Sequence, residues 1–172
     1  MNWKTLTSIC AIGLVVGFGI RAALSPSSPS RTERIAQIFE HVCVAHYQGH
    51  DAATLAAKYA TPVDVGMGGT IWIDGQSVSF LSLNKHECSI QTTSPHHLSD
   101  EQASELATLT ELIVKQNFPE LIFDPKAVMG SISKGWFLGK RQSPERWGIS
   151  FFGFPDWDDQ SGSFLTFHLP RS

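Results

Sequence analysis

The sequence has few charged residues and few cysteines, and it contains no recognisable catalytic motif. Charged residues make up 17% of the 172-residue chain, which excludes a disordered tail or an RNA-binding arm as its main body. The 13 basic and 16 acidic residues give a net charge of -3, so nothing attracts the chain to nucleic acid. A nucleophile elbow, a kinase motif set and a pair of catalytic carboxylates are all missing, and no cofactor is expected. The 42% of hydrophobic residues suffices for one domain with a modest core.

The first 24 residues are ordered like an export signal. Lys4 supplies a positive charge, and residues 6–20 are apolar apart from small or weakly polar interruptions. Residues 25–31 form a spacer rich in proline and serine. This order predicts that residues 32–172 fold on the far side of the bacterial inner membrane, in the periplasm.

Two fates remain open for this leader. The small-x-small site Ala23-Leu24-Ser25 is followed by Pro26, which disfavours cleavage. An uncleaved single-pass anchor, with residues 6–24 in the membrane, is therefore the favoured interpretation. The alternative is a cleaved signal peptide and a secreted or periplasmic product.

The cysteine count supports the same compartment. Cys10 lies in the apolar leader, which leaves Cys43 and Cys88 in the exported part. An even pair in an oxidising compartment predicts a disulfide between them. It closes a loop of about 45 residues, which corresponds to roughly 4 kcal/mol in the chain-entropy estimate.

The hydrophobic pattern predicts an α+β domain with two layers. Thr32 is expected to cap a helix that runs to about Ala60 with a break at Gly49, and Cys43 lies on its apolar face. A second helix starts at Ser99, with Leu106, Leu109, Leu112 and Ile113 on its apolar side and a capping box formed with Gln102. Strands are expected at 71–73, 77–83, 86–91, 127–132, 136–140, 147–154 and 164–169.

Helices should therefore pack on one face of a twisted antiparallel sheet, behind the N-terminal membrane or signal helix. Asp74-Gly75 predicts a two-residue turn between the first two strands. A helix followed by three strands occurs twice, but the two halves share no residue pattern. The repeated order alone therefore does not predict a duplication.

One arrangement of residues offers metal ligands. Cys43-x-x-His46 and His86-x-Cys88 would bring two thiolates and two imidazoles together, a set that suits zinc. Disulfide formation competes with this site outside the cytoplasm, so no metal is expected. His46 and His86 remain the candidate ligands of an alternative, metal-binding protein.

The C-terminal third combines basic and aromatic residues. Five basic residues and one glutamate lie between Lys126 and Trp147. Aromatic residues with arginine are typical of interface anchors. Trp136, Arg141, Trp147 and Trp157 are therefore the candidate partner-binding residues.

Part of the chain resembles small exported, signal-anchored bacterial proteins of unknown function. The resemblance covers residues 33–92 and is carried by Phe39-x3-Cys43, by the Trp72 strand and by Cys88-x-Ile90. It implies export and a disulfide, and no activity.

These observations favour a non-enzymatic accessory or binding protein that faces the periplasm and is tethered to the inner membrane. Its partner would be a membrane-protein complex, of which it is a subunit, or another periplasmic protein. The alternatives are the metal-binding protein described above and a secreted enzyme with an unfamiliar site.

Overall fold

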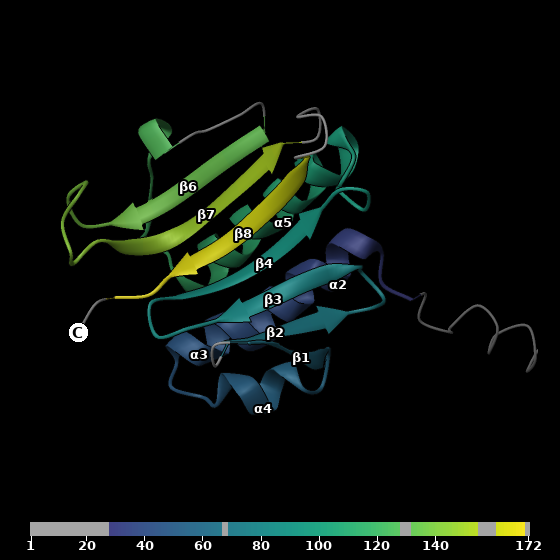
Figure 1. Cartoon of the computed structure of the whole chain (residues 1–172). Helices are drawn as coiled ribbons and strands as arrows, with labels where there is room; N and C mark the ends of the chain where they lie inside the picture. Colours follow the sequence, from purple (N-terminus) through teal and green to yellow (C-terminus); the bar gives the residue numbers. More distant parts are fainter. Residues whose placement is uncertain (1–27, 67–68, 128–131, 155–160, 171–172) are drawn as a thin grey trace, which may run out of the picture.

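The computed structural model describes residues 28–66, 69–127, 132–154 and 161–170 (Figure 1). The expected anchor or signal helix, residues 1–24, lies outside this part of the chain. Among the described helices, none combines the length and the apolar character needed to cross a membrane.

An eight-stranded antiparallel sheet forms the body of the described chain and confirms the expected α+β class (Figure 1). The helices α2 and α5 lie behind the sheet in this view, so the opposite face is turned to the reader. The strand order is β1-β2-β3-β4-β8-β7-β6-β5. The strands are β1 (Thr61–Gly66), β2 (Gly69–Asp74), β3 (Ser79–Leu83), β4 (Glu87–Thr93), β5 (Ile122–Phe123), β6 (Ile132–Leu138), β7 (Trp147–Phe154) and β8 (Gly162–His168).

The sheet has a mirrored order around its two central strands, β4 and β8. Each half of the described chain supplies helical segments and then four strands that run from one edge of the sheet to its centre. Ile90 of β4 pairs with Leu165 of β8, and each also pairs with a core residue of the next strand outward, Leu81 or Phe151. The order of a helix followed by strands, which occurs twice in the sequence, thus corresponds to the two halves of one sheet. Each half has four strands rather than the expected three.

The first helix, α2 (Arg31–Ile38), begins one residue before its expected cap. Ser30 is the N-cap: its Oγ accepts from the Glu33 backbone N–H, and the Glu33 carboxylate accepts from the Ser30 N–H. Thr32 instead donates its hydroxyl proton to Glu105 of the second long helix at 2.7 Å. The expectation that Thr32 caps the helix was therefore wrong, because this side chain is buried between two helices.

Three further helical segments follow: the π-helix η1 (Phe39–Val44), α3 (Ala45–Tyr47) and α4 (Ala52–Ala56). The chain breaks between the last two at Gly49, where φ is +90°, as the sequence predicted. η1 turns Phe39, Val42 and Cys43 into the core.

The long helix α5 (Asp100–Asn117) has the expected capping box of Ser99 and Gln102. Leu106 and Ile113 are buried as expected, but Leu112 is 55% exposed. The predicted apolar side was wrong at Leu112 because the buried stripe is built around Ala103, Leu106, Ala107, Thr110, Ile113 and Val114.

The predicted disulfide joins the helical layer to the middle of the sheet. Cys43 of η1 and Cys88 of β4 are bonded, their Cα atoms are 5.4 Å apart, and both residues are fully buried. Phe39 and Phe167 pack close by, with ring centroids 6.4 Å apart. The bond therefore crosslinks the centre of the core.

The turn between β2 and β3 differs from the expected two-residue turn. Four residues separate the strands, because Asp74 pairs with Ser79. Asp74 is buried and accepts hydrogen bonds from the backbone and hydroxyl of Ser77, and it forms a salt bridge with Arg34 at 3.2 Å. Asp74 is therefore an internal hydrogen-bond acceptor and not an exposed turn residue.

The strand predictions were partly wrong at the two edges of the sheet. β1 was missed, since it contains Pro62, and β5 was missed because it has two residues. Ala127 lies in the 3-10 turn η2 (Pro125–Ala127) rather than in a strand. The bounds of β7 were predicted correctly, and the strand lies between two others in the sheet. Its bulky residues are buried on one face, at Trp147, Ile149 and Phe151, and half-buried on the other, at Phe152 and Phe154.

Candidate functional site: a basic pocket at the β6–β7 end of the sheet

A pocket of about 530 Å³ lies where the β6–β7 connection approaches the ends of β4 and β8. We call it the β6–β7 pocket. It opens on the sheet face that α2 and α5 leave uncovered, which we call the open face. Its lining residues are His86, Glu87, Phe137, Gln142, Ser143, Pro144, Arg146, Phe152, His168 and Leu169.

Strand alternation explains which side chains reach this pocket. In β8, Leu165 and Phe167 point into the core, so His168 points to the open face. In β7, Ile149 and Phe151 are buried in the core, which turns Phe152 outward. Phe152 therefore contributes an apolar part of the pocket lining, and His168 contributes a polar part.

Glycine makes room for the aromatic wall of the pocket. Gly148 of β7 pairs with Phe137 of β6. A Cβ atom at residue 148 would lie 2.1 Å from the Trp136 carbonyl oxygen and 2.8 Å from Phe137 Cδ1. Any larger residue at position 148 would push β6 and the Phe137 ring away.

Arg146 is held on this wall in a fixed orientation. Its guanidinium carbon lies 4.1 Å from the centroid of the Phe137 ring, and one Nη donates to Asp124 Oδ2 at 2.6 Å. The hydrogen bond from Arg146 lowers the pKa of Asp124, so this carboxylate stays ionised. A guanidinium has five N–H donors, so the bond to Asp124 leaves donors for a ligand.

His168 forms a polar pair on the floor of the site. Its Nε2 is 2.9 Å from Ser150 Oγ, on the neighbouring strand. Burial lowers the pKa of His168. This effect outweighs the opposing influence of Glu87, which is the residue of β4 that pairs with His168. The imidazole is therefore neutral at neutral pH and can act as either a donor or an acceptor.

The Ser150–His168–Glu87 arrangement resembles the order of groups in a hydrolytic triad, but its nucleophile is inaccessible. Ser150 has 0% of its surface exposed. The Glu87 carboxylate accepts a hydrogen bond from the Asn84 side chain at 3.3 Å. A serine that no substrate can reach acts as a structural partner of the histidine, so these three residues do not work as a hydrolytic triad.

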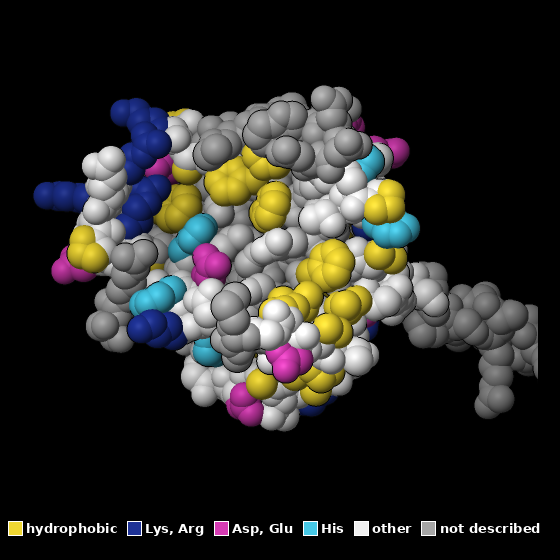
Figure 2. Space-filling model, in the orientation of Figure 1, with side chains coloured by type: hydrophobic (Ala, Val, Ile, Leu, Met, Phe, Trp, Pro, Cys, Tyr) yellow, Lys and Arg dark blue, Asp and Glu magenta, His cyan; other side chains and the backbone are white. Residues whose placement is uncertain are grey.

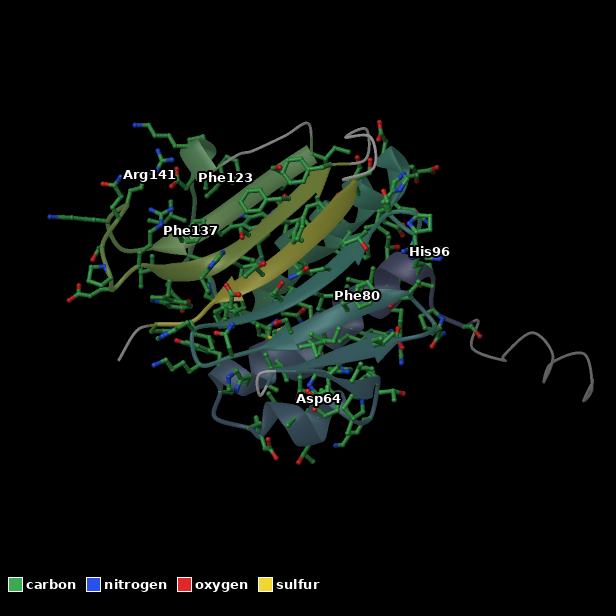
Figure 3. All side chains as sticks on the ribbon, in the orientation of Figure 1. Asp64, Phe80, His96, Phe123, Phe137 and Arg141 are labelled. Carbon is green, nitrogen blue, oxygen red and sulfur yellow. A yellow bond between two sulfur atoms is a disulfide. The ribbon has the colours of Figure 1, made fainter. Side chains whose placement is uncertain are left out.

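Positive charge collects around the pocket although the whole chain is acidic. Figure 2 shows dark-blue side chains grouped at the left end of the open face, and Figure 3 labels Arg141 there. Among the residues that line the pocket, neighbour its lining residues in the chain or are hydrogen-bonded beside it, the basic ones are Lys85, Lys126, Lys140, Arg141 and Arg146, and the acidic ones are Glu87, Asp124 and Glu145. Five positive against three negative charges favour an anion here.

A second cavity, of about 570 Å³, lies between α5 and β6, and its charges are already paired. Glu111 binds Lys115 at 2.7 Å and Lys134 at 2.6 Å. Hydrogen bonds from these two lysines lower the pKa of Glu111 to about 2. This cavity therefore offers a ligand less unpaired charge than the β6–β7 pocket does.

The structure separates the predicted partner-binding residues. Trp136 and Trp147 fill the core, with 6% and 8% of their surfaces exposed, so neither ring is available as an exposed anchor. Arg141 is exposed beside the pocket and donates to the Lys126 carbonyl at 3.1 Å. Trp157 lies outside the described residues.

The predicted metal ligands do not form a cluster. The sulfur atoms of Cys43 and Cys88 are bonded to each other, so neither residue offers a thiolate to a metal. In the part of the chain that the structure describes, no three His, Cys, Asp or Glu side chains are grouped so that they could hold a metal ion. His86 lines the β6–β7 pocket instead, and His46 lies in α3.

Sequence reasoning missed Phe137, Ser150 and His168 as site residues. Arg146 entered only as one of several basic residues. Alternation within β7 and β8 could have placed His168 and Phe152 on one face, but the β7–β8 register that puts Ser150 beside His168 is a long-range property.

Comparison with known proteins adds no further constraint: no family model, curated protein or solved structure matches this chain.

Proposed function

We propose that this protein is a non-enzymatic, exported binding protein and that its β6–β7 pocket binds a small organic anion. The observation that carries the proposal is the pocket itself. An oriented guanidinium and a neutral, hydrogen-bonded histidine line the same pocket as the rings of Phe137 and Phe152. Ligand sites typically combine an apolar lining with a few fixed polar groups in this way.

The proposal retains the cellular setting that the sequence favours. Residues 6–24 would tether the domain to the bacterial inner membrane, facing the periplasm, and the Cys43–Cys88 disulfide supports an oxidising compartment. A cleaved leader would leave the same domain free in the periplasm. In either case the protein would act as an accessory protein, alone or within a membrane complex.

Calorimetric titration with hexanoate, a short organic anion, tests the pocket. The Arg146→Gln variant should bind hexanoate at least tenfold more weakly, because a charge-assisted hydrogen bond is lost. The Glu87→Gln variant should bind it roughly two- to fivefold more tightly, because a nearby negative charge is removed. A gain in affinity cannot result from misfolding, so the Glu87→Gln variant is the stronger test of the proposal.

Leu112→Ser is the matched control, since Leu112 is exposed on α5 and lies outside the pocket. It should bind hexanoate like the wild type. Absence of hexanoate binding by the wild type, or unchanged affinity in both charge variants, would overturn the proposed function.

A further inference from the structure

An aromatic row leads out of the β6–β7 pocket across the open face. Phe152 lines the pocket and pairs with Phe164 of β8. Phe164 in turn pairs with Gln91 of β4, and Gln91 pairs with Phe80 of β3. We call Phe152, Phe164 and Phe80 the phenylalanine row. Because directly paired residues lie on the same face of a sheet, the three rings share the open face.

The row is interrupted at β4, where the polar residue Gln91 lies between Phe164 and Phe80. Neighbouring strands lie about 4.8 Å apart, so the three steps from β7 to β3 span about 14 Å. Each of the three phenylalanines is half-buried. Figure 3 labels Phe137, which lines the pocket, and Phe80 of the row, which lies farther across the sheet.

The neighbouring row of the open face is polar but recessed. It contains Ser150, Thr166 and Ser89, which follow one another across β7, β8 and β4. All three are buried, with 0%, 8% and 3% exposure. A molecule that lies on this part of the open face therefore meets the taller aromatic rings rather than the hydroxyl groups.

Charge marks one end of the phenylalanine row. The basic residues described above surround the pocket at the Phe152 end. At the Phe80 end the row continues to Ile73 of β2, which pairs with Phe80. A ligand that matches this surface has an anionic head at one end and an apolar body at the other.

We propose that the ligand is a single-chain fatty carboxylate, with its head at Arg146 and its hydrocarbon chain along the phenylalanine row. This inference rests on the proposed function and specifies the ligand class for the same pocket. The pocket of about 530 Å³ suits one headgroup and the start of one chain. The apolar row explains why phenylalanines remain on a sheet face that the described helices do not cover.

The test is a chain-length series of carboxylates, from butanoate to dodecanoate, kept below their micelle-forming concentrations. Each buried methylene should strengthen binding about two- to fourfold, so dodecanoate should bind on the order of a hundredfold or more tightly than hexanoate. Dodecyltrimethylammonium, which has the same chain and a cationic head, should bind at least tenfold more weakly than dodecanoate.

Two variants locate the chain. Phe164→Ser should weaken dodecanoate binding at least fivefold and leave hexanoate binding unchanged, because Phe164 lies four residues beyond the level of His168 on β8, which only the longer chain reaches. Phe123→Ser is the matched control, since Phe123 is an exposed phenylalanine on the edge strand β5 outside this surface. It should alter neither affinity.

The outcomes separate this inference from the proposed function. If hexanoate binds through Arg146 but affinity does not rise with chain length, the fatty-carboxylate inference is wrong and the anion site stands. Equal binding of the cationic amphiphile would also overturn the inference. If no carboxylate binds at all, both proposals fail.

Discussion

At the scale of single residues, His168 shows how the open face keeps a titratable group neutral. Its imidazole contacts Ser150, faces Glu87 across the strand pair, and lies near Arg146. Burial is the largest influence, and it lowers the pKa of His168 below the ordinary value near 6.5. The folded state therefore resists protonation of this residue.

This environment predicts a pH dependence of stability. Below about pH 6.5 the unfolded chain takes up a proton on His168 that the folded protein does not, so the free energy of unfolding should decrease as the pH falls. His168→Gln keeps a hydrogen-bonding side chain and should reduce this decrease. Urea unfolding between pH 5 and 8 measures it. A His168 pKa at or above 6.5, followed by NMR, would contradict the account.

Gly148 predicts a local limit on side-chain size. Gly148→Ala should lower the free energy of unfolding by about 2 kcal/mol or more, since the new Cβ would collide with the backbone of β6. Gly75→Ala is the matched control, because nothing lies within 4 Å of a Cβ at that position. Chemical denaturation of both variants tests the difference, and equal midpoints would refute the steric argument.

At the scale of elements, the disulfide connects layers that come from separate parts of the sequence. Cys43 lies in η1, which packs on the sheet, and Cys88 lies in the central strand β4. The loop between them contains the whole β1–β3 meander. The bond therefore restricts the unfolded chain over three of the four strands in that half of the sheet.

Removing the bond should destabilise the domain substantially. The Cys43→Ala/Cys88→Ala double variant should lose about 4 kcal/mol of unfolding free energy by the chain-entropy estimate. Guanidinium unfolding with and without reductant provides the measurement. Reductant should destabilise the wild type and leave the double variant unchanged; a wild type insensitive to complete reduction would argue against this role.

The elements differed in how well the sequence predicted them, for identifiable reasons. α5 was predicted from its capping box, and β7 from a run of bulky residues, because both signals are local. β1 was missed because Pro62 disfavours a strand, yet at a sheet edge proline is tolerated. The four-residue turn after Asp74 was missed because Arg34, far away in the sequence, draws that carboxylate inward.

At the scale of the whole molecule, the described N-terminus lies at the end of the sheet opposite the β6–β7 connection (Figure 1), and the pocket lies beside that connection. Arg31 fixes the N-terminal end by donating hydrogen bonds to the carbonyls of Ser77, His96 and His97, in the β2–β3 and β4–α5 connections. The β3–β4 and β6–β7 connections lie at the other end, beside the pocket. In the proposed tethered protein, the pocket would therefore lie at the end remote from the tether.

The overall class followed from the sequence, but the site did not. Periodicity and capping signals were sufficient for helices packed on an antiparallel sheet, and compartment and cysteine count together predicted the Cys43–Cys88 bond. The pocket depends on the register between β7, β8 and β4, which brings Ser150, His168 and Glu87 together from distant segments. Local patterns contain no information about the register between β7 and β8, because these two strands carry bulky residues on both faces.

The most direct test of the binding account is an NMR titration of the oxidised domain, residues 28–172, with hexanoate, followed by backbone amide and histidine side-chain shifts. We expect saturable changes confined to the β6–β7 connection and to the residues around Glu87, Gly148 and His168, and their loss in Arg146→Gln. Shifts spread evenly over the surface, or centred on the cavity between α5 and β6, would contradict the account.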